Sequence, residues 1–190
     1  MPHFYHYLFL ALWLSWATYW WVSSRNVKQT VRRESLPSRL AHIGPLALAA
    51  FLLSVPHMPI PGLGERFVAH ATWILDIAVC LTATGMLFTV WARRYIGPNW
   101  SASVTIKRDH ELVTGGPYAL VRHPIYTGLL LAFAGSALAV GEWRGVLAVA
   151  VASIALWRKL RLEERWMREQ FGAVYQEYSR RVAALIPFVL

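Results

Sequence analysis

Long apolar runs alternate with short polar connections along the whole chain. Five runs carry almost no charge: residues 4–22, 40–55, 67–91, 125–140 and 146–157. At a rise of about 1.5 Å per residue, the first and third are long enough as helices to cross a hydrocarbon core of about 30 Å. The last two are shorter and are separated by a tight turn at residues 141–145. Neither spans a bilayer comfortably without tilt or thinning, so a helical hairpin is favoured, and whether it crosses fully or in part stays open. The pattern predicts an all-α integral membrane bundle of about five transmembrane helices.

The basic residues gather in the connections and not in the runs. The first connection carries five of them, at positions 25, 28, 32, 33 and 39, which places it in the cytoplasm by the positive-inside rule. We therefore expect the N-terminus outside and a charged, amphipathic C-terminal helix in the cytoplasm, in the inner membrane if the chain is bacterial. The net charge of +9 is explained by this asymmetry, so we do not expect nucleic-acid binding. Ten Trp and eight Tyr, several of them at run ends, are typical of interfacial aromatic belts.

The length of 190 residues predicts one domain, with membrane helices in residues 1–92 and the chemistry in residues 93–190. Several common sites have no counterpart in the sequence. The single cysteine and the absence of a ligand spacing argue against a metal site, so none is expected. There is no glycine-rich strand-to-helix turn, phosphate loop or serine-centred elbow.

The densest polar stretch is Thr114–Gly128, which reads TGGPYALVRHPIYTG and lies between apolar runs. Such a segment is costly near lipid unless it lines a cavity or is buried in protein. Pro124 forces His123 out of helical geometry and suits the first position of a helix, whose free N–H groups attract anions. A plain helix start with an interfacial His and Arg explains the same residues, and both interpretations stay open.

A second polar cluster follows the last apolar run and consists of Arg158, Arg161, Glu163 and Glu164. A solvated charged helix would explain it. The hairpin topology, however, returns this cluster to the membrane face where the preceding helix begins, beside His123. Two adjacent carboxylates near an apolar helix face need partners, because an unpaired buried charge is costly. We therefore expect the two clusters to converge on one site.

Two sequence motifs carry a resemblance to a known family. The stretches HELVTGGPY at residues 110–118 and VRHPIYTG at residues 121–128 resemble the isoprenylcysteine carboxyl methyltransferase family, which is related to the phospholipid N-methyltransferases. The later pairs Glu163-Glu164 and Phe171-Gly172 extend the match, together with Tyr175, Tyr178, Arg181-Val182 and Ile186-Pro187. The resemblance covers roughly the C-terminal half, and the N-terminal half shows no matching motif.

The resemblance implies a membrane enzyme that uses S-adenosyl-L-methionine and takes a lipophilic or lipid-linked acceptor from the bilayer lipids. Carried over by position, the cofactor site comprises His110, Leu112, Val113, Gly116, Tyr118, His123, Pro124 and Tyr126, closed by Glu163 and Glu164. The acceptor would be the carboxylate of an isoprenylcysteine-like compound. An arginine would hold that carboxylate, and the candidates are Arg122, Arg158 and Arg161.

Three other functions compete with this one. A phospholipid amine N-methyltransferase would use the same cofactor. A membrane sterol-type reductase would instead need NADPH, and a non-catalytic scaffold or small transporter would bind neither. Cofactor binding separates these hypotheses.

Overall fold

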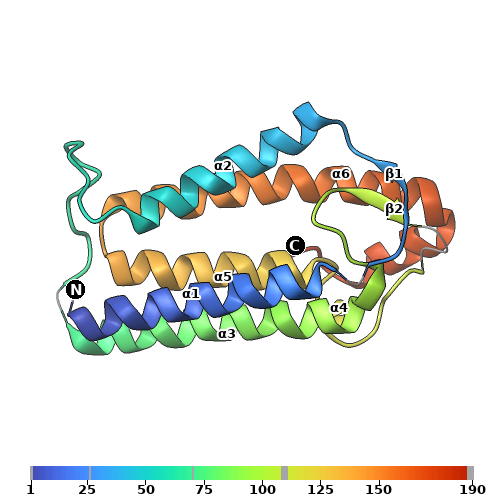
Figure 1. Cartoon of the computed structure of the whole chain (residues 1–190). Coiled ribbons are helices and arrows are strands. Elements are labelled where there is room, and N and C mark those ends of the chain that lie inside the picture. Colours follow the sequence, from blue (N-terminus) through green and yellow to red (C-terminus); the bar gives the residue numbers. More distant parts are fainter. Residues whose placement is uncertain (1, 26, 70, 108–110, 188–190) are drawn as a thin grey trace.

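The computed structural model describes residues 2–25, 27–69, 71–107 and 111–187. Five long helices lie side by side in an elongated bundle (Figure 1). They are α1 (His3–Ser23), α2 (Leu36–Ser54), α3 (Thr72–Ile96), α5 (Pro124–Val140) and α6 (Trp143–Arg181). Each of the five apolar runs predicted from the sequence therefore forms a helix. By length and composition, two segments could cross a membrane, namely Leu36–Ser54 and Thr72–Asn99.

Some helix boundaries differ from the expectation. The third helix begins at Thr72 and not near residue 67. The N–H of Phe67 instead bonds the carbonyl of Gly141, and the neighbouring Arg66 forms an isolated β-bridge with Glu142. The C-terminal helix is also not separate from the hairpin. α6 runs without interruption from the second arm of the hairpin to Gly172, whose φ of +51° bends the chain before the helix resumes. The continuity of the second hairpin arm with the C-terminal helix was not predicted from the sequence.

The remaining elements lie at one end of the bundle (Figure 1). They are the 3-10 helix η1 (Gly97–Asn99), the short helix α4 (Pro117–Leu120), and the strands β1 (Thr30–Arg33) and β2 (Thr105–Lys107). The strands pair antiparallel, with Thr30 opposite Lys107 and Arg33 opposite Thr105. This pairing ties the first connection to the segment that leads into the polar motif.

Small residues let α3 and α5 pack backbone against backbone. A Cβ atom on Gly85 would lie 2.4 Å from the carbonyl oxygen of Gly128, and one on Gly128 would lie 2.5 Å from that of Gly85. A Cβ on Gly135 would meet the Thr82 hydroxyl at 2.4 Å. Helices in lipid associate through such close contacts, since lipid tails are as apolar as the side chains. The contact fixes where α5 begins, and with it the position of the polar motif.

The opposite end of the bundle is held by a buried arginine. The Arg144 guanidinium bonds Glu142 Oε2 at 2.6 Å and the carbonyl of Leu52 at 3.0 Å, and it also bonds the carbonyl of Val55. It thereby supplies donors to the free carbonyls at the C-terminal end of α2. The turn between α5 and α6 and the end of α2 are joined in this way, so α2 lies along α6 (Figure 1).

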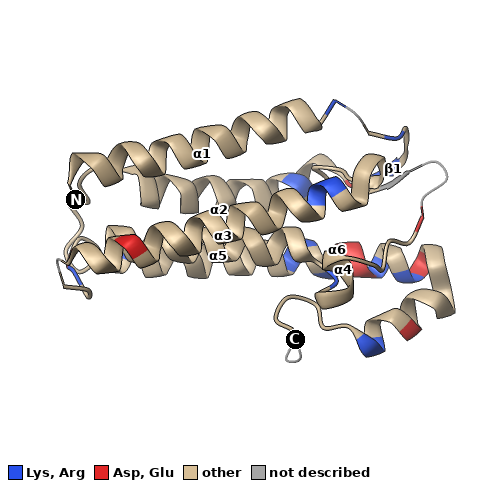
Figure 2. Ribbon diagram, turned by 90° about the horizontal axis from the view of Figure 1, so that it is seen from below, with Lys and Arg blue, Asp and Glu red and all other residues tan. Residues whose placement is uncertain are grey.

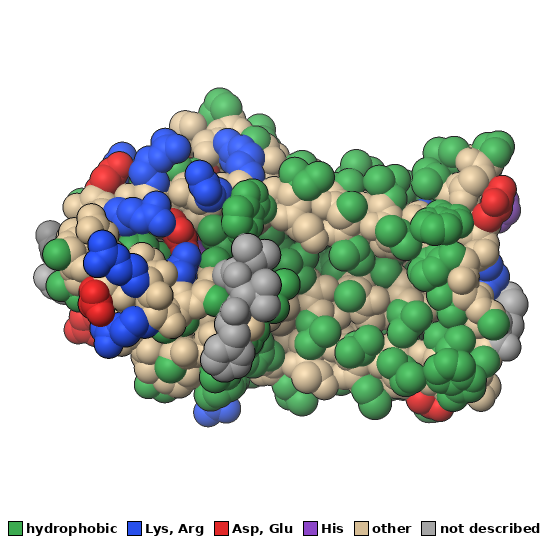
Figure 3. All heavy atoms as spheres, turned by 180° about the vertical axis from the view of Figure 1, so that it is seen from behind, with side chains coloured by type: hydrophobic (Ala, Val, Ile, Leu, Met, Phe, Trp, Pro, Cys, Tyr) green, Lys and Arg blue, Asp and Glu red, His purple; other side chains and the backbone are tan. Residues whose placement is uncertain are grey.

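Charge is distributed unevenly along the bundle. Lys and Arg concentrate at the end that carries β1 and α4, as Figure 2 shows. Apolar side chains cover most of the rest of the face seen in Figure 3. An apolar belt with one basic end is the arrangement expected of a bundle that lies in a membrane.

We expect Gly128→Ala to lower the melting temperature of the detergent-purified protein, because its new Cβ would lie 2.5 Å from a backbone oxygen that cannot move freely. Overpacking of this kind costs about 1–3 kcal/mol. Gly44→Ala is the matched control, since a Cβ at this helical glycine of α2 meets nothing within 4 Å. Equal melting temperatures for the two variants would contradict the packing described.

Candidate active site

A cavity of about 270 Å³ opens at the basic end of the bundle. Its wall is built mainly from residues 99–105 after α3, residues 111–126, α6 and the end of α1, and Leu46 of α2 and Leu129 of α5 also line it. The 111–126 segment and α6 supply its charged groups, whereas Trp16, Trp20 and Leu46 are apolar. The cavity therefore has a polar end and an apolar end.

Most of the residues predicted for a cofactor lie on this wall. Six of them line the 111–126 side: Leu112, Val113, Tyr118, His123, Pro124 and Tyr126. Glu163 lines the cavity from α6. His110 lies outside the described residues. The expected geometry around Pro124 is confirmed, because His123 has non-helical φ and ψ of −124° and 61° and Pro124 is the first residue of α5.

Two predicted cofactor residues lie behind the wall. Gly116 has a φ of +56° and begins α4, and a Cβ there would lie 2.5 Å from the ring of Tyr95. Its role in the structure is to turn the chain tightly against that ring. Glu164 is 4% exposed and supports the wall through its contacts with Arg122 and His123.

The predicted convergence of the two polar clusters is observed. His123 lies between the carboxylates of α6, with Nδ1 3.6 Å from Glu163 Oε2 and Nε2 3.5 Å from Glu164 Oε1. The Tyr126 hydroxyl donates to Glu163 Oε1 at 2.6 Å, and its ring stacks on His123 with 5.4 Å between centroids. Residues about forty positions apart in the sequence thus form one network.

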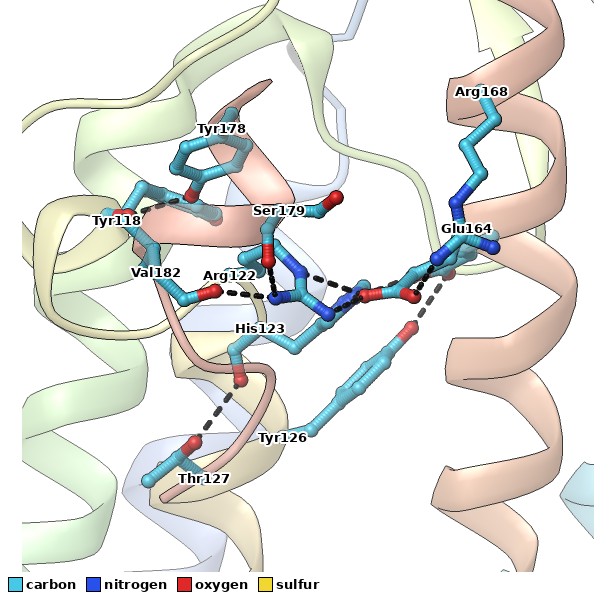
Figure 4. Close-up of polar contacts among 11 residues, drawn as sticks. Tyr118, Arg122, His123, Tyr126, Thr127, Glu164, Arg168, Tyr178, Ser179 and Val182 are labelled. Atoms are coloured by element: carbon cyan, nitrogen blue, oxygen red, sulfur yellow. Dashed lines mark hydrogen bonds and ion pairs between the residues drawn. The ribbon is translucent and has the colours of Figure 1, made fainter. Parts of the chain in front are cut away.

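Arg122 is fully engaged by groups of the protein. Its Nε and Nη2 donate to Glu164 Oε1 at 2.7 and 2.5 Å, and its Nη1 donates to the carbonyls of Ser179 and Val182 (Figure 4). The backbone N–H groups of Arg122 and His123 donate to the carbonyls of residues 183 and 184 at 2.8 and 3.0 Å. The arginine therefore anchors the C-terminal segment and the end of α6 to the start of α5.

The other two candidate arginines lie away from the cavity. Arg158 is exposed and donates to the carbonyl of Ser38 at 3.1 Å. Arg161 is exposed as well, and neither residue is among the described residues that line the wall. Of the three arginines expected to hold an acceptor carboxylate, Arg122 is already bonded to Glu164, and Arg158 and Arg161 do not line the described part of the cavity.

The electrostatics of the site favour charged carboxylates next to a charged histidine. Burial alone would raise the pKa of Glu164, but the bonds from His123 and Arg122 lower it to about 2. Burial opposes ionisation of Glu163 too, yet Lys159, His123 and Tyr126 lower its pKa. Burial would lower the pKa of His123, and the two carboxylates outweigh it and raise this pKa.

Sequence reasoning missed the wall formed by residues 99–105. Glu34 holds this segment in place: its Oε1 accepts from the N–H of Val104 at 3.0 Å, and its own N–H donates to the Val104 carbonyl at 3.0 Å. Lys159 holds it from the other side, donating to the carbonyl of Ala102 at 2.9 Å. The i,i+4 spacing of Lys159 and Glu163 was a signal for the lysine, whereas nothing in the sequence singled out Glu34.

Two cavity-lining residues of the 99–105 segment have a buried polar atom without a hydrogen-bond partner in the described part of the chain. They are Asn99 Oδ1 and Thr105 Oγ1. Buried polar groups are normally bonded, so unpaired ones on one cavity wall indicate a polar ligand. The cavity is therefore suited to a molecule with both polar and apolar parts.

Comparison with known proteins gives the family. The family model for phospholipid methyltransferases matches residues 73–174, which include the cavity wall from residue 99 to Glu163 and the supporting Glu164. The chain belongs to the phospholipid methyltransferase family. The resemblance predicted from the two sequence motifs is thereby confirmed, since the curated relatives within it include isoprenylcysteine methyltransferases.

The relatives are longer than this chain. Protein-S-isoprenylcysteine O-methyltransferase B of Arabidopsis thaliana is 30% identical over 68% of this chain and 64% of its own length. The Schizosaccharomyces pombe protein-S-isoprenylcysteine O-methyltransferase is 34% identical over 49% and 41%. The cobalt-zinc-cadmium resistance protein CzcN of Cupriavidus metallidurans is 32% identical over 61% and 52%. In each case this chain spans less than two thirds of the relative.

A solved structure shares the fold. The eukaryotic intramembrane Ras methyltransferase ICMT (isoprenylcysteine carboxyl methyltransferase) superposes with a TM-score of 0.54 at 23% identity, over 84% of this chain and 55% of that one. This chain therefore shares the helical fold of that structure over most of its length.

Because Glu164 is ionised in its buried pair with Arg122, the folded protein should lose stability as the pH becomes acidic. The pKa of Glu164 is about 2 in the folded protein and about 4.5 without its partners, so the ionised form contributes stability above pH 4.5. That contribution is lost as the pH falls from 4.5 towards 2.

We expect the melting temperature of the wild type to drop more steeply between pH 6 and pH 3 than that of Glu164→Gln. Glu177→Gln, whose carboxylate is exposed beside Arg181, should keep the wild-type slope. Identical slopes for wild type and Glu164→Gln would contradict the assignment.

Proposed function

We propose that this chain is an S-adenosyl-L-methionine-dependent methyltransferase that acts on the carboxylate of a lipophilic, isoprenylcysteine-like acceptor. The observation that carries this proposal is the cavity itself, in which a buried ionised network adjoins an apolar compartment at the membrane end. Family membership and the isoprenylcysteine methyltransferases among the relatives support the same chemistry.

The residues on the wall fit S-adenosyl-L-methionine. Tyr118 and Tyr126 present aromatic rings, which suit a cationic sulfonium. The carboxylate of Glu163 supplies a negative charge, and the unpartnered Asn99 Oδ1 and Thr105 Oγ1 can bond the polar groups of a nucleoside or an amino acid. When bound, S-adenosyl-L-methionine supplies a methyl group on a positively charged sulfur.

The chain's own contribution is position and exclusion of water. An ionised carboxylate acceptor has no proton to lose, so general-base catalysis is not required. Holding both reactants in line supplies much of the barrier reduction. The His123–Glu163–Tyr126 network fixes one wall of the cavity, and the Arg122–Glu164 ion pair behind it holds that wall in position.

The apolar end of the cavity would hold the acceptor's hydrocarbon chain. Trp16 and Trp20 on α1, Leu46 on α2, Leu129 on α5 and Leu156 on α6 line it. Because these helices belong to the apolar belt, the acceptor would enter from the bilayer. Residues 1–92 thus complete a single-domain site whose cofactor side lies in residues 93–190, and they would set acceptor preference.

A phospholipid amine is the second candidate acceptor. It is favoured by the description of the family model that matches the chain. Such an acceptor would also place its hydrocarbon in the apolar end, so the two candidates differ mainly in the charge of the reacting group.

The basic end of the bundle would face the cytoplasm, with five crossings and the N-terminus on the other side. Two segments are long and apolar enough to cross, and α1, α5 and the first part of α6 run alongside them (Figure 1). The concentration of Lys and Arg around the cavity supports this orientation (Figure 2).

Calorimetry of the detergent-purified protein should show binding of S-adenosyl-L-methionine and S-adenosyl-L-homocysteine but not of NADPH. His123→Ala should weaken binding about tenfold or more, because one charge-assisted hydrogen bond contributes about 1.5–3 kcal/mol. Arg161→Ala, exposed on the same side of the bundle, should bind like the wild type. Wild-type affinity in His123→Ala, or binding of NADPH in place of the sulfonium, would refute the assigned site.

Cysteine labelling in intact cells tests the orientation. On a Cys80→Ser background, Pro61→Cys in the connection between α2 and α3 should react with an impermeant maleimide added outside. Gln176→Cys, exposed near the end of α6, should react only after permeabilisation. Labelling of both positions from one side would rule out the five crossings.

A further inference from the structure

One cation in the cavity has no role in the account so far. Lys159 is only 8% exposed and lines the cavity from α6, one helical turn before Glu163. Its Nζ donates to the carbonyl of Ala102 at 2.9 Å and lies 5.2 Å from the ring centroid of Tyr126. An ammonium this deeply buried is costly unless oxygen atoms surround it.

The protein itself satisfies this ammonium only in part. The nearest carboxylate oxygen, Glu163 Oε1, is 3.8 Å away and already accepts from the Tyr126 hydroxyl at 2.6 Å. A lysine ammonium has three N–H groups, and the one hydrogen bond that it makes within the described residues is to a neutral carbonyl. Lys159 therefore has capacity for an anionic partner.

No other cation lining the described part of the cavity has this capacity. Both ring nitrogens of His123 face the carboxylates of Glu163 and Glu164. Arg122 lines the wall but is occupied by Glu164 and two carbonyls. Arg93, buried near the same end, donates to the carbonyls of Ser23 and Gly97 and is not on the wall. The wall next to Lys159 also carries the unpartnered polar atoms of Asn99 and Thr105, so the surroundings are built for a polar group.

We propose that Lys159 binds the carboxylate of the methyl acceptor and makes the site selective for an anionic acceptor over an amine. This inference rests on the proposed methyl transfer and names its acceptor class. A carboxylate beside Nζ gains a charge-assisted hydrogen bond, whereas an ammonium head group there is repelled by the like charge. The lysine thus separates the two candidate acceptors.

The chemistry of the transfer also assigns the lysine a part in product release. A carboxylate oxygen forms the new C–O bond, and the methyl–sulfur bond breaks with its electron pair remaining on sulfur as a neutral thioether. No proton is moved. The product is a neutral methyl ester, which has lost the charge that Lys159 recognises, so it binds more weakly than the acceptor.

Equilibrium binding tests this without turnover. The probes are an S-prenylated N-acylcysteine and its carboxamide, which has the same shape and hydrocarbon but no charge. The wild type should bind the carboxylate at least tenfold more tightly. Lys159→Met should bind both probes alike, at about the affinity of the carboxamide, and Lys159→Arg should keep most of the preference. Arg161→Met, which removes the same charge from the same helix outside the cavity, should match the wild type.

The affinity for S-adenosyl-L-methionine is measured on every variant as a control for folding. It should change by less than about threefold. Lys159→Gln replaces Lys159→Met if the latter does not fold. A neutral variant that still prefers the carboxylate overturns the inference, as does loss of cofactor binding in both Lys159→Arg and a neutral variant.

The outcomes for the wild type separate this inference from the proposed function. A wild type that prefers a phospholipid amine overturns the role of Lys159 while leaving methyl transfer in place. A wild type that shows the carboxylate preference, lost without Lys159, but never transfers a methyl group supports the lysine site and refutes the proposed reaction.

Discussion

The buried ion pair between Arg122 and Glu164 is the interaction on which the candidate site depends. It joins the start of α5 to the middle of α6 at 2.5 Å, and the same guanidinium bonds the carbonyls of Ser179 and Val182. Taking two charges out of water is expensive, and removing one partner leaves the other uncompensated. His123 lies against the same carboxylate, so the geometry of the polar wall follows from this one contact.

The ion pair can form only because the helices that carry it are held elsewhere. Glycines bring α3 and α5 into backbone contact, and Arg144 fastens the far end of the hairpin to α2. With the far end fixed, α6 returns along α5 and places Lys159 and Glu163 beside the cavity. Packing in the apolar half of the molecule thus determines electrostatics in the polar half.

Much of this was predictable from the sequence, for physical reasons. The lengths of the apolar runs predicted the helices, because a run of apolar residues long enough to span the hydrocarbon core can be recognised from its own sequence. Pro124 fixed the helix start after His123, and hairpin topology brought Glu163 and Glu164 to it. The pairing of β1 with β2, the Glu34 contact with Val104 and the engagement of Arg122 were not predictable, because each joins residues distant in sequence without a periodic pattern. An arginine was expected to bind a carboxylate, whereas Lys159, the residue proposed for that role, was not among the candidates from the sequence.

The C-terminal segment has a consequence for how the protein is made. Residues 183–185 bond back to Arg122, His123 and Thr127, and form one side of the ordered motif. In a nascent chain these residues leave the ribosome after all five apolar helices. Membrane insertion of the helices and completion of the polar wall are therefore separate events in time.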